Sequence, residues 1–158
     1  MARVAARVAI ALGSNLGNRR GHLDYAVSRL ASSVADLVVS SFIETDPVGV
    51  GPQPAFLNGA AVGVTHLSPR ELLDTLLAIE RERGRARPFP GAPRTLDLDL
   101  VLYGTLVVSE PGLEVPHPRF RDRAFVLGPL AEVGPDLTDP VTGLSVARLW
   151  ADLRARGA

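Results

Sequence analysis

Residues 93–100 read Pro93-Arg94-Thr95-Leu96-Asp97-Leu98-Asp99-Leu100, and apolar residues continue from there to Tyr103. Successive side chains of a β-strand point to opposite faces, so this alternation predicts a strand from Leu96 to Tyr103. The leucines should face the core, and Asp97 and Asp99 should lie together on the opposite face. The strand is therefore expected to have one apolar face and one polar face.

The segments on both sides of this strand complete a recognisable order of elements. Strands are expected at Val4–Leu12, Leu37–Thr45 and Phe56–His66, and helices from Asn18 to about Ser33 and from Ser68 to near Gly84. Gly13-Ser14-Asn15 is expected to be a tight loop, and Gly59 and Gly63 to weaken their strand or to mark close backbone approach. Another strand is expected at Thr105–Ser109, followed by helical pieces at 124–133 and 145–154.

This order, βαββαβ with a C-terminal extension, predicts an α+β protein of the ferredoxin-like class. Such a fold has an antiparallel sheet with helices on one face. A chain of 158 residues without an internal repeat or linker is expected to form one domain, residues 1–158. Because this fold hosts many activities, the function has to be inferred from the residues of the site.

The composition excludes several kinds of chemistry. All 17 basic residues are arginine and 17 residues are acidic, so no net charge favours nucleic acid or a membrane surface. The absence of lysine excludes a P-loop lysine and a Schiff base, and the absence of cysteine excludes disulfides, zinc ribbons and thiolate nucleophiles. The apolar run Val4–Leu12 is too short to cross a bilayer and lacks a signal-peptide plan. A soluble, cytoplasmic protein is expected.

Asp97 and Asp99 form a candidate metal site. Residues two apart on a strand are separated by roughly 6.6 Å, so two carboxylates can hold hard cations between them, and paired metal ions are common in phosphoryl transfer. A plain amphipathic strand with a solvated face is the alternative. Two like charges on one face are mildly unfavourable without a cation, which favours the metal site.

Basic residues cluster near these aspartates. Five arginines and two glutamates lie between Glu80 and Arg94, and arginine forks suit phosphate. For Arg81 and Arg83 a solvated helix end is the better interpretation. A further cluster, Pro116–Arg123, contains His117, for which a surface histidine is the alternative to a phosphate contact. The segment 13–18 lacks the spacing of a dinucleotide-binding loop.

Taken together, these motifs resemble the 6-hydroxymethyl-7,8-dihydropterin pyrophosphokinase family of folate synthesis. The P-R-T-L-D-L-D motif at 93–99 is close to diagnostic for it. The other matching blocks follow in the same order: Ala11–Gly17, Thr45–Gly49, Phe56-Leu57-Asn58, Gly84–Arg87, Val115-Pro116-His117, Arg123–Leu127 and Pro129-Leu130.

The resemblance implies an enzyme that moves pyrophosphate from ATP to the hydroxymethyl group of the dihydropterin and releases AMP. It implies two Mg²⁺ ions on Asp97 and Asp99, and a catalytic role in charge neutralisation for Arg85 and Arg94. The implied ATP contacts are Glu80, Arg85, Arg94, Thr95, His117 and Arg123. The implied pterin contacts are Thr45, Val48, Phe56, Asn58 and Phe125.

The chain departs from the family at three places. Asp46 stands where proline is frequent, Phe56 where tyrosine is common, and Pro88–Ala92 replaces a longer loop with an aromatic residue. We expect Phe89 to cover the site in place of that residue, or else to anchor the loop. A monomer is expected. The alternatives are another magnesium-dependent phosphotransferase and an RNA-binding module, but the latter should show exposed aromatic residues where Asp97 and Asp99 stand.

Overall fold

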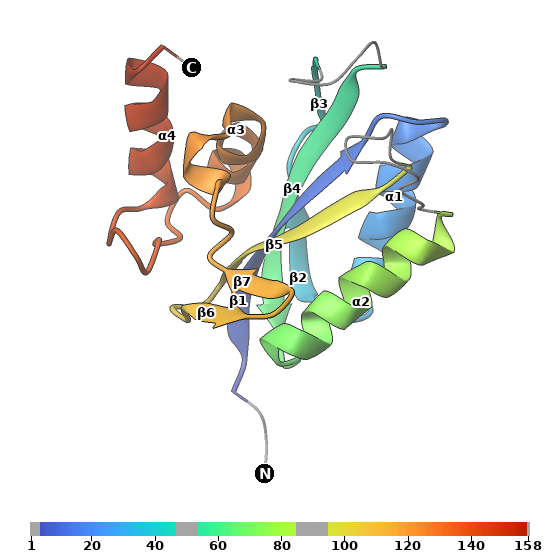
Figure 1. Ribbon diagram of the computed structural model, residues 1–158, viewed down its shortest axis with the longest axis horizontal. Helices are drawn as coiled ribbons and strands as arrows, with labels where there is room; N and C mark the ends of the chain where they lie inside the picture. The colour runs from blue at the N-terminus through green and yellow to red at the C-terminus, as the bar shows by residue number, and fades with distance from the viewer. Residues whose placement is uncertain (1–3, 47–53, 85–94, 158) are drawn as a thin grey trace.

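The computed structural model describes residues 4–46, 54–84 and 95–157 (Figure 1). Its strands are β1 (Ala6–Ser14), β2 (Ala35–Val39), β3 (Ile43–Thr45), β4 (Phe56–Thr65), β5 (Asp97–Tyr103), β6 (Val108–Glu110) and β7 (Leu113–Val115). Its helices are α1 (Arg19–Leu30), α2 (Pro69–Glu82), α3 (Ala124–Val133) and α4 (Val146–Ala155), with a 3₁₀ turn, η1, at Phe120–Asp122.

One antiparallel sheet organises the chain. Its order is β2-β4-β1-β5, with β3 also paired to β4, so β1 and β4 are central strands and β5 forms one edge. Helices α1 and α2 connect the strands in the βαββαβ order that the sequence predicts. The α+β, ferredoxin-like prediction is therefore confirmed.

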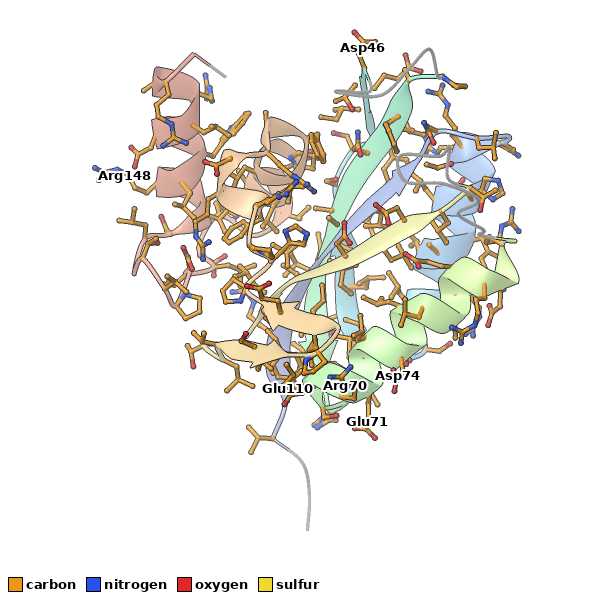
Figure 2. The ribbon with its side chains drawn as sticks, viewed as in Figure 1. Asp46, Arg70, Glu71, Asp74, Glu110 and Arg148 are labelled. Atoms are coloured by element: carbon orange, nitrogen blue, oxygen red, sulfur yellow. The ribbon has the colours of Figure 1, made fainter. Side chains whose placement is uncertain are left out.

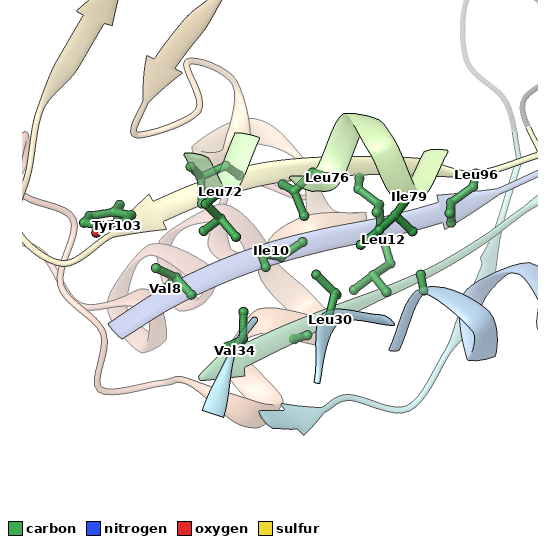
Figure 3. Packing of buried hydrophobic residues seen from close by; sticks show 14 of the residues in the cluster. Val8, Ile10, Leu12, Leu30, Val34, Leu72, Leu76, Ile79, Leu96 and Tyr103 are labelled. Carbon is green, nitrogen blue, oxygen red and sulfur yellow. The ribbon is translucent and has the colours of Figure 1, made fainter. Parts of the chain in front are cut away.

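Between this sheet and helices α1 and α2 lies the larger apolar core. Large side chains alternate along β1 and β5 towards the helices, and the helices present residues three and four apart towards the sheet (Figure 3). The fully buried members include Val8, Ile10, Leu12, Leu23, Leu30, Leu72, Leu76, Ile79 and Leu96.

The opposite face of the sheet is covered in part by the C-terminal helices. Small residues of β1 and β4 on this face, Ala9, Ala11 and Ala60, pack with apolar residues of α3 and α4 in a second core. Figure 1 shows α3 between the sheet and α4, with α1 and α2 on the other side. The helices of the βαββαβ unit, α1 and α2, lie on one face as expected, and the C-terminal extension adds a second layer on the other face.

The start of α2 follows the predicted chemistry closely. The Ser68 side chain accepts a hydrogen bond from the Glu71 N–H, and the Glu71 carboxylate accepts one from the Ser68 N–H. Pro69 occupies the first turn, where its missing N–H costs nothing. The last turns of the same helix carry Glu80, whose carboxylate accepts a hydrogen bond from β5.

Two sequence interpretations of strand limits are wrong. Gly13-Ser14 is not a loop: both residues belong to β1, because β1 is paired on both sides, with β4 and β5. The strand expected at Thr105–Ser109 begins only at Val108 and pairs with β7 in a separate hairpin. Gly104 turns the chain with φ +53°, so the expected turn is present.

The strand expected at Leu37–Thr45 is interrupted. Between β2 and β3, the Ser40 side chain accepts a hydrogen bond from the Ala60 N–H of β4, which replaces part of the ladder. A Cβ on Gly59 would lie 2.6 Å from the Phe42 ring, and a Cβ on Gly63 would lie 2.5 Å from Val34. The prediction of close approach at these glycines is confirmed.

A buried ion pair fixes the C-terminal layer. The Asp139 carboxylate is fully buried and accepts hydrogen bonds from Arg121 of η1, from the Thr142 hydroxyl and from the Val141 N–H. Burial alone would raise the pKa of Asp139, but these donors lower it to about 2.

Among the described residues, no helix is long and apolar enough to span a bilayer.

Candidate active site

Asp97 and Asp99 of β5 lie on the face of the sheet that carries α3. Both are partly exposed, whereas the alternating residues Leu96, Leu98 and Leu100 are buried. Asp97 is paired with Gly13 of β1, and Asp99 with Ala11. The predicted alternation, with leucines inward and aspartates on the other face, is confirmed.

A row of residues crosses the sheet from Asp97. Gly13 pairs with Asp97 on one side and with Asn58 of β4 on the other, and directly paired residues point to the same face. Since neighbouring strands are about 4.8 Å apart, the Cα atoms of Asp97 and Asn58 are about 10 Å apart. We call Asp97, Gly13 and Asn58 the cross-strand row.

Gly13 leaves the middle of the cross-strand row without a side chain. A Cβ at this position would lie 3.1 Å from the Asn58 Oδ1 and 3.9 Å from the Phe56 ring. Gly13 and Asn58 are both buried, so the main chain of the row lies directly beneath the Asn58 amide. A residue without a side chain lets another group approach the main chain closely at this point.

The pterin contacts expected from the sequence gather at the Asn58 end. Asn58 is buried, and its Nδ2 donates a hydrogen bond of 2.6 Å to the Thr45 hydroxyl. Thr45 is paired with Phe56 at the start of β4. Phe125 of α3 packs into the second core with Ala11 and Ala60, on the same face. The structure thus brings together Thr45, Phe56 and Asn58, and it places Phe125 on the same face of the sheet.

His117 and Arg123 approach the row from the aspartate end. The His117 N–H donates to the Val101 carbonyl of β5. Burial lowers the pKa of His117, Arg123 lowers it further, and Asp97 opposes both effects. Arg123 also stands 5.5 Å from the centre of the Phe125 ring, so this cation adjoins both sets of expected contacts.

Glu80 and Thr95 lie at the start of β5. Glu80 is buried, and its carboxylate accepts a hydrogen bond of 2.7 Å from the Leu98 N–H. The Thr95 Oγ1 is buried and has no hydrogen-bond partner among the described residues. Both residues adjoin the aspartates, while their expected contact with a nucleotide stays a prediction.

A surface pocket of about 290 Å³ lies along the free edge of β5, between α2 and the β6–β7 hairpin. Asp99 and His117 line it together with two glutamates and several apolar residues, so it adjoins the aspartate end of the row. The other walls of the pocket could not be predicted from the sequence, because their positions follow from the hairpin rather than from a motif. These are Leu73, Leu98, Leu100, Glu110, Gly112, Leu113, Glu114 and Pro118.

Arg70 ties the pocket together. Its guanidinium donates to the Glu110 carboxylate and to the Pro111 carbonyl, and thereby links the start of α2 to the β6–β7 turn. Figure 2 shows Arg70 and Glu110 beside each other below α2. The opposite walls of the pocket are therefore joined.

The donor set at Asp97 and Asp99 fits a hard divalent cation that takes its remaining ligands from a substrate. Among the described residues, no group of three or more acidic, histidine or cysteine side chains could hold a metal by itself. Mg²⁺ characteristically uses one or two carboxylates and completes its shell with phosphate oxygens and water. The pair is consistent with this pattern.

Several expected site residues lie outside the described residues: Val48, Arg85, Arg94 and Phe89. Of the arginines expected to be solvated, Arg81 is exposed, as predicted. Arg83 differs: it donates to the His22 Nδ1 at 2.9 Å and stacks on Tyr25. Arg83 thus joins α2 to α1, and the pKa of His22 is lowered by burial and by this cation.

The fold and the site define a class: a ferredoxin-like α+β protein with paired carboxylates at one end of a cross-strand row. Residues 9–135 match the family model described as 7,8-dihydro-6-hydroxymethylpterin-pyrophosphokinase. The chain belongs to this family, whose members transfer pyrophosphate from ATP to hydroxymethyldihydropterin in folate synthesis.

Relatives of similar length and a much longer relative agree with this assignment. The 2-amino-4-hydroxy-6-hydroxymethyldihydropteridine pyrophosphokinase of Pseudomonas aeruginosa is 46% identical over 85% of this chain and 84% of its own length. The Bacillus subtilis enzyme of the same name is 45% identical over 89% and 88%. A folic acid synthesis protein of Pneumocystis carinii is 42% identical over 89% of this chain, but the chain spans only 19% of that protein.

A solved structure shares the fold. The wild-type HPPK-DHPS of Plasmodium falciparum superposes with a TM-score of 0.76 over 98% of this chain and 46% of its own, at 13% sequence identity. At this identity the likeness concerns the fold alone.

Proposed function

We propose that this chain transfers pyrophosphate from ATP to the hydroxymethyl group of 6-hydroxymethyl-7,8-dihydropterin and releases AMP. The observation that carries the proposal is the cross-strand row. It holds carboxylates at one end and an amide with two nearby phenylalanines at the other, about 10 Å apart, on the same face of the sheet. Phosphates and a flat heterocycle would meet over Gly13.

ATP would lie with its nucleoside in the pocket along β5 and its phosphates towards Asp99 and His117. The leucines among the lining residues of that pocket would contact a purine ring, its carboxylates could accept hydrogen bonds from the nucleoside, and its volume of about 290 Å³ suits part of a nucleotide. Arg123 would contact phosphate, and the Thr95 hydroxyl, which has no partner among the described residues, would have one in the nucleotide.

The pterin would occupy the Asn58 end of the row. Phe56 and Phe125 would stack on its ring, and Asn58, oriented by Thr45, would recognise its polar edge. Phe56 has no hydroxyl to add a further hydrogen bond. Bound in this way, the hydroxymethyl group would point along the row towards Asp97.

Asp97 and Asp99 would hold magnesium, and we propose two ions. When bound, Mg²⁺ supplies charge neutralisation for the phosphates and fixes their orientation. His117 and Arg123 would hold the phosphates in line with the pterin oxygen. That oxygen would bond to the β-phosphorus and give its proton to water, while the bond from this phosphorus to the α,β-bridging oxygen breaks and AMP leaves with that oxygen.

The remaining expectations stay predictions. Arg85 and Arg94 would neutralise charge on the transferred group. A monomer, one domain over residues 1–158 and a cytoplasmic location are likewise predictions. Membership in the pyrophosphokinase family favours this reaction over an RNA-binding module or a different phosphotransferase.

The test is AMP formation from ATP and Mg²⁺, with and without the hydroxymethyldihydropterin. AMP that appears only with the pterin, together with the pyrophosphorylated pterin in equal amount, supports the proposal. AMP formed at the same rate without pterin would indicate another phosphotransferase. No AMP in either case, from a folded protein that binds Mg·ATP, would refute the proposed reaction.

A further inference from the structure

We infer that Arg19 is a positioning residue for the pterin end of the site. It holds together the two stretches of backbone that lead into Thr45 and Phe56. This inference rests on the proposed pterin pocket, and it assigns a role to the Gly13–Asn18 region and the helix start that follows it. Arg19 itself does not belong to the proposed binding residues.

The local sequence places Arg19 at the start of α1. Gly17 turns the chain with φ +72°, and the Asn18 side chain caps the helix by accepting a hydrogen bond from the Gly21 N–H. Arg19 is the first residue of the helix, and the first turn contains no acidic residue. Because the N-terminus of a helix disfavours positive charge, a cation here serves the helix poorly. Its contacts point to another role.

The guanidinium of Arg19 makes two hydrogen bonds to different stretches of chain. Its Nη1 donates to the Ala55 carbonyl at 2.8 Å, and its Nη2 donates to the Glu44 carboxylate at 2.5 Å. The side chain is 29% exposed, less than the other arginines of surface ion pairs on this helix. A planar fork can hold two acceptors in fixed geometry, which a lysine ammonium cannot do.

Both acceptors directly adjoin residues of the proposed pterin pocket. Glu44 precedes Thr45 in β3, and Ala55 precedes Phe56 at the start of β4. Thr45 and Phe56 are themselves paired across the two strands. Since Thr45 orients Asn58, the position of β3 relative to β4 determines the position of three proposed pterin contacts.

Asn15, from the same region, also holds the segment that leads into β4. Asn15 is fully buried, and its Nδ2 lies 3.4 Å from the Pro54 carbonyl, one residue before the Arg19 contact. Two side chains that follow β1 therefore hold consecutive carbonyls ahead of β4. The segment that follows Gly13 and the segment that leads into Phe56 are thus fixed to each other.

The experiment compares Arg19→Ala, Arg19→Lys and the matched control Arg20→Ala. Arg20 is the next residue of the same helix turn and is 71% exposed; it pairs with Asp24 and stacks on the Phe42 ring at 4.8 Å. Arg20→Ala therefore controls for the loss of a cation beside β3 that leaves the Arg19 bonds to Glu44 and Ala55 in place. Arg19→Ala removes both charged hydrogen bonds and should raise the KM for the pterin about 10-fold, with the KM for ATP within about 2-fold of wild type. Arg19→Lys should recover only part of the loss. Arg20→Ala should change neither constant.

Amide hydrogen exchange gives a readout that does not depend on activity. Arg19→Ala should speed exchange in Ile43–Thr45 and at the start of β4, with β5 unchanged and with Arg20→Ala like wild type. Unchanged exchange and unchanged KM for the pterin would overturn the inference. An equal rise in both KM values with a general loss of protection would also overturn it. If wild type forms no AMP, the proposed reaction fails, and exchange still decides whether Arg19 positions these strands.

Discussion

The Glu80 carboxylate of α2 accepts a hydrogen bond of 2.7 Å from the backbone N–H of Leu98, the residue between Asp97 and Asp99. Both Glu80 and Leu98 are buried. A buried carboxylate on the edge of β5 thus holds the backbone from which the two proposed metal ligands project. On the side of β5 away from β1, the described residues place no neighbouring strand that could do so.

We predict that Glu80→Ala destabilises the protein by about 1–3 kcal/mol, because it leaves a buried N–H without its acceptor. Glu80→Gln keeps an acceptor and should lose less. The Mg²⁺ concentration for half-maximal rate should rise more for Glu80→Ala than for Glu80→Gln, because the backbone that carries Asp97 and Asp99 is then held less firmly. Urea denaturation and magnesium titration measure the two effects. A rate loss without any change in stability or magnesium dependence would indicate direct contact with ATP instead.

Asp97→Asn and Asp99→Asn should abolish pyrophosphate transfer and leave the fold intact, because both side chains point away from the large core. The matched control is Asp74→Asn, an exposed acid on α2 that Figure 2 shows away from β5. AMP formation at saturating Mg²⁺ and thermal unfolding are the measurements. Near-normal turnover of either variant would contradict the metal assignment.

Gly13→Ala should raise the KM for the pterin by roughly 10-fold, the equivalent of about 1.4 kcal/mol. Its Cβ would lie 3.1 Å from the Asn58 Oδ1, and Asn58 is buried and held by Thr45, so the amide has little room to move. If the effect passes through Asn58, adding Gly13→Ala to Asn58→Ala should cost little more than Asn58→Ala alone. Full additivity would show that the new methyl group acts on something else.

Asp139→Asn should destabilise the protein by about 3 kcal/mol near neutral pH, because it breaks a buried pair and leaves Arg121 without its partner. The pKa of Asp139 is lowered to about 2, so the carboxylate contributes its full stability above the ordinary value of 3.8. This contribution is lost as the pH falls from about 4 to about 2.

The check is urea denaturation from pH 5 to pH 2 for wild type, Asp139→Asn and Asp136→Asn. Asp136 pairs with Arg7 at the surface, where both side chains are well exposed, so its loss should cost little. The difference between wild type and Asp139→Asn should shrink towards pH 2. A difference independent of pH would mean that the lost packing, not the charge, is responsible.

Much of the fold follows from local sequence chemistry. The alternation of Leu96–Leu100 and the capping box at Ser68 each specify an element and its buried face, and both agree with the structure. The limits of β1 did not follow, because Gly13 is a turn residue by local preference. Pairing with Asp97 and Asn58 on both sides outweighs that preference, and such pairing between distant strands has no local signal.

The site was predictable in its parts but not in their arrangement. The aspartates, His117 and Asn58 were identified from motifs, and the sheet order then brings three strands together at one row. The burial of Glu80, the bonds of Arg19 and the pocket along β5 depend on how helices and a hairpin meet the sheet. Periodicity within one segment carries no information on such contacts.

The middle residue of the cross-strand row, Gly13, offers only main chain, and this limits which substitutions could make the protein resistant to an inhibitor. A compound that spans Asp97 and Asn58 would rest on Gly13, where a single substitution adds a methyl group that meets Asn58 first. Resistance at Gly13 would therefore damage recognition of the natural substrate as well.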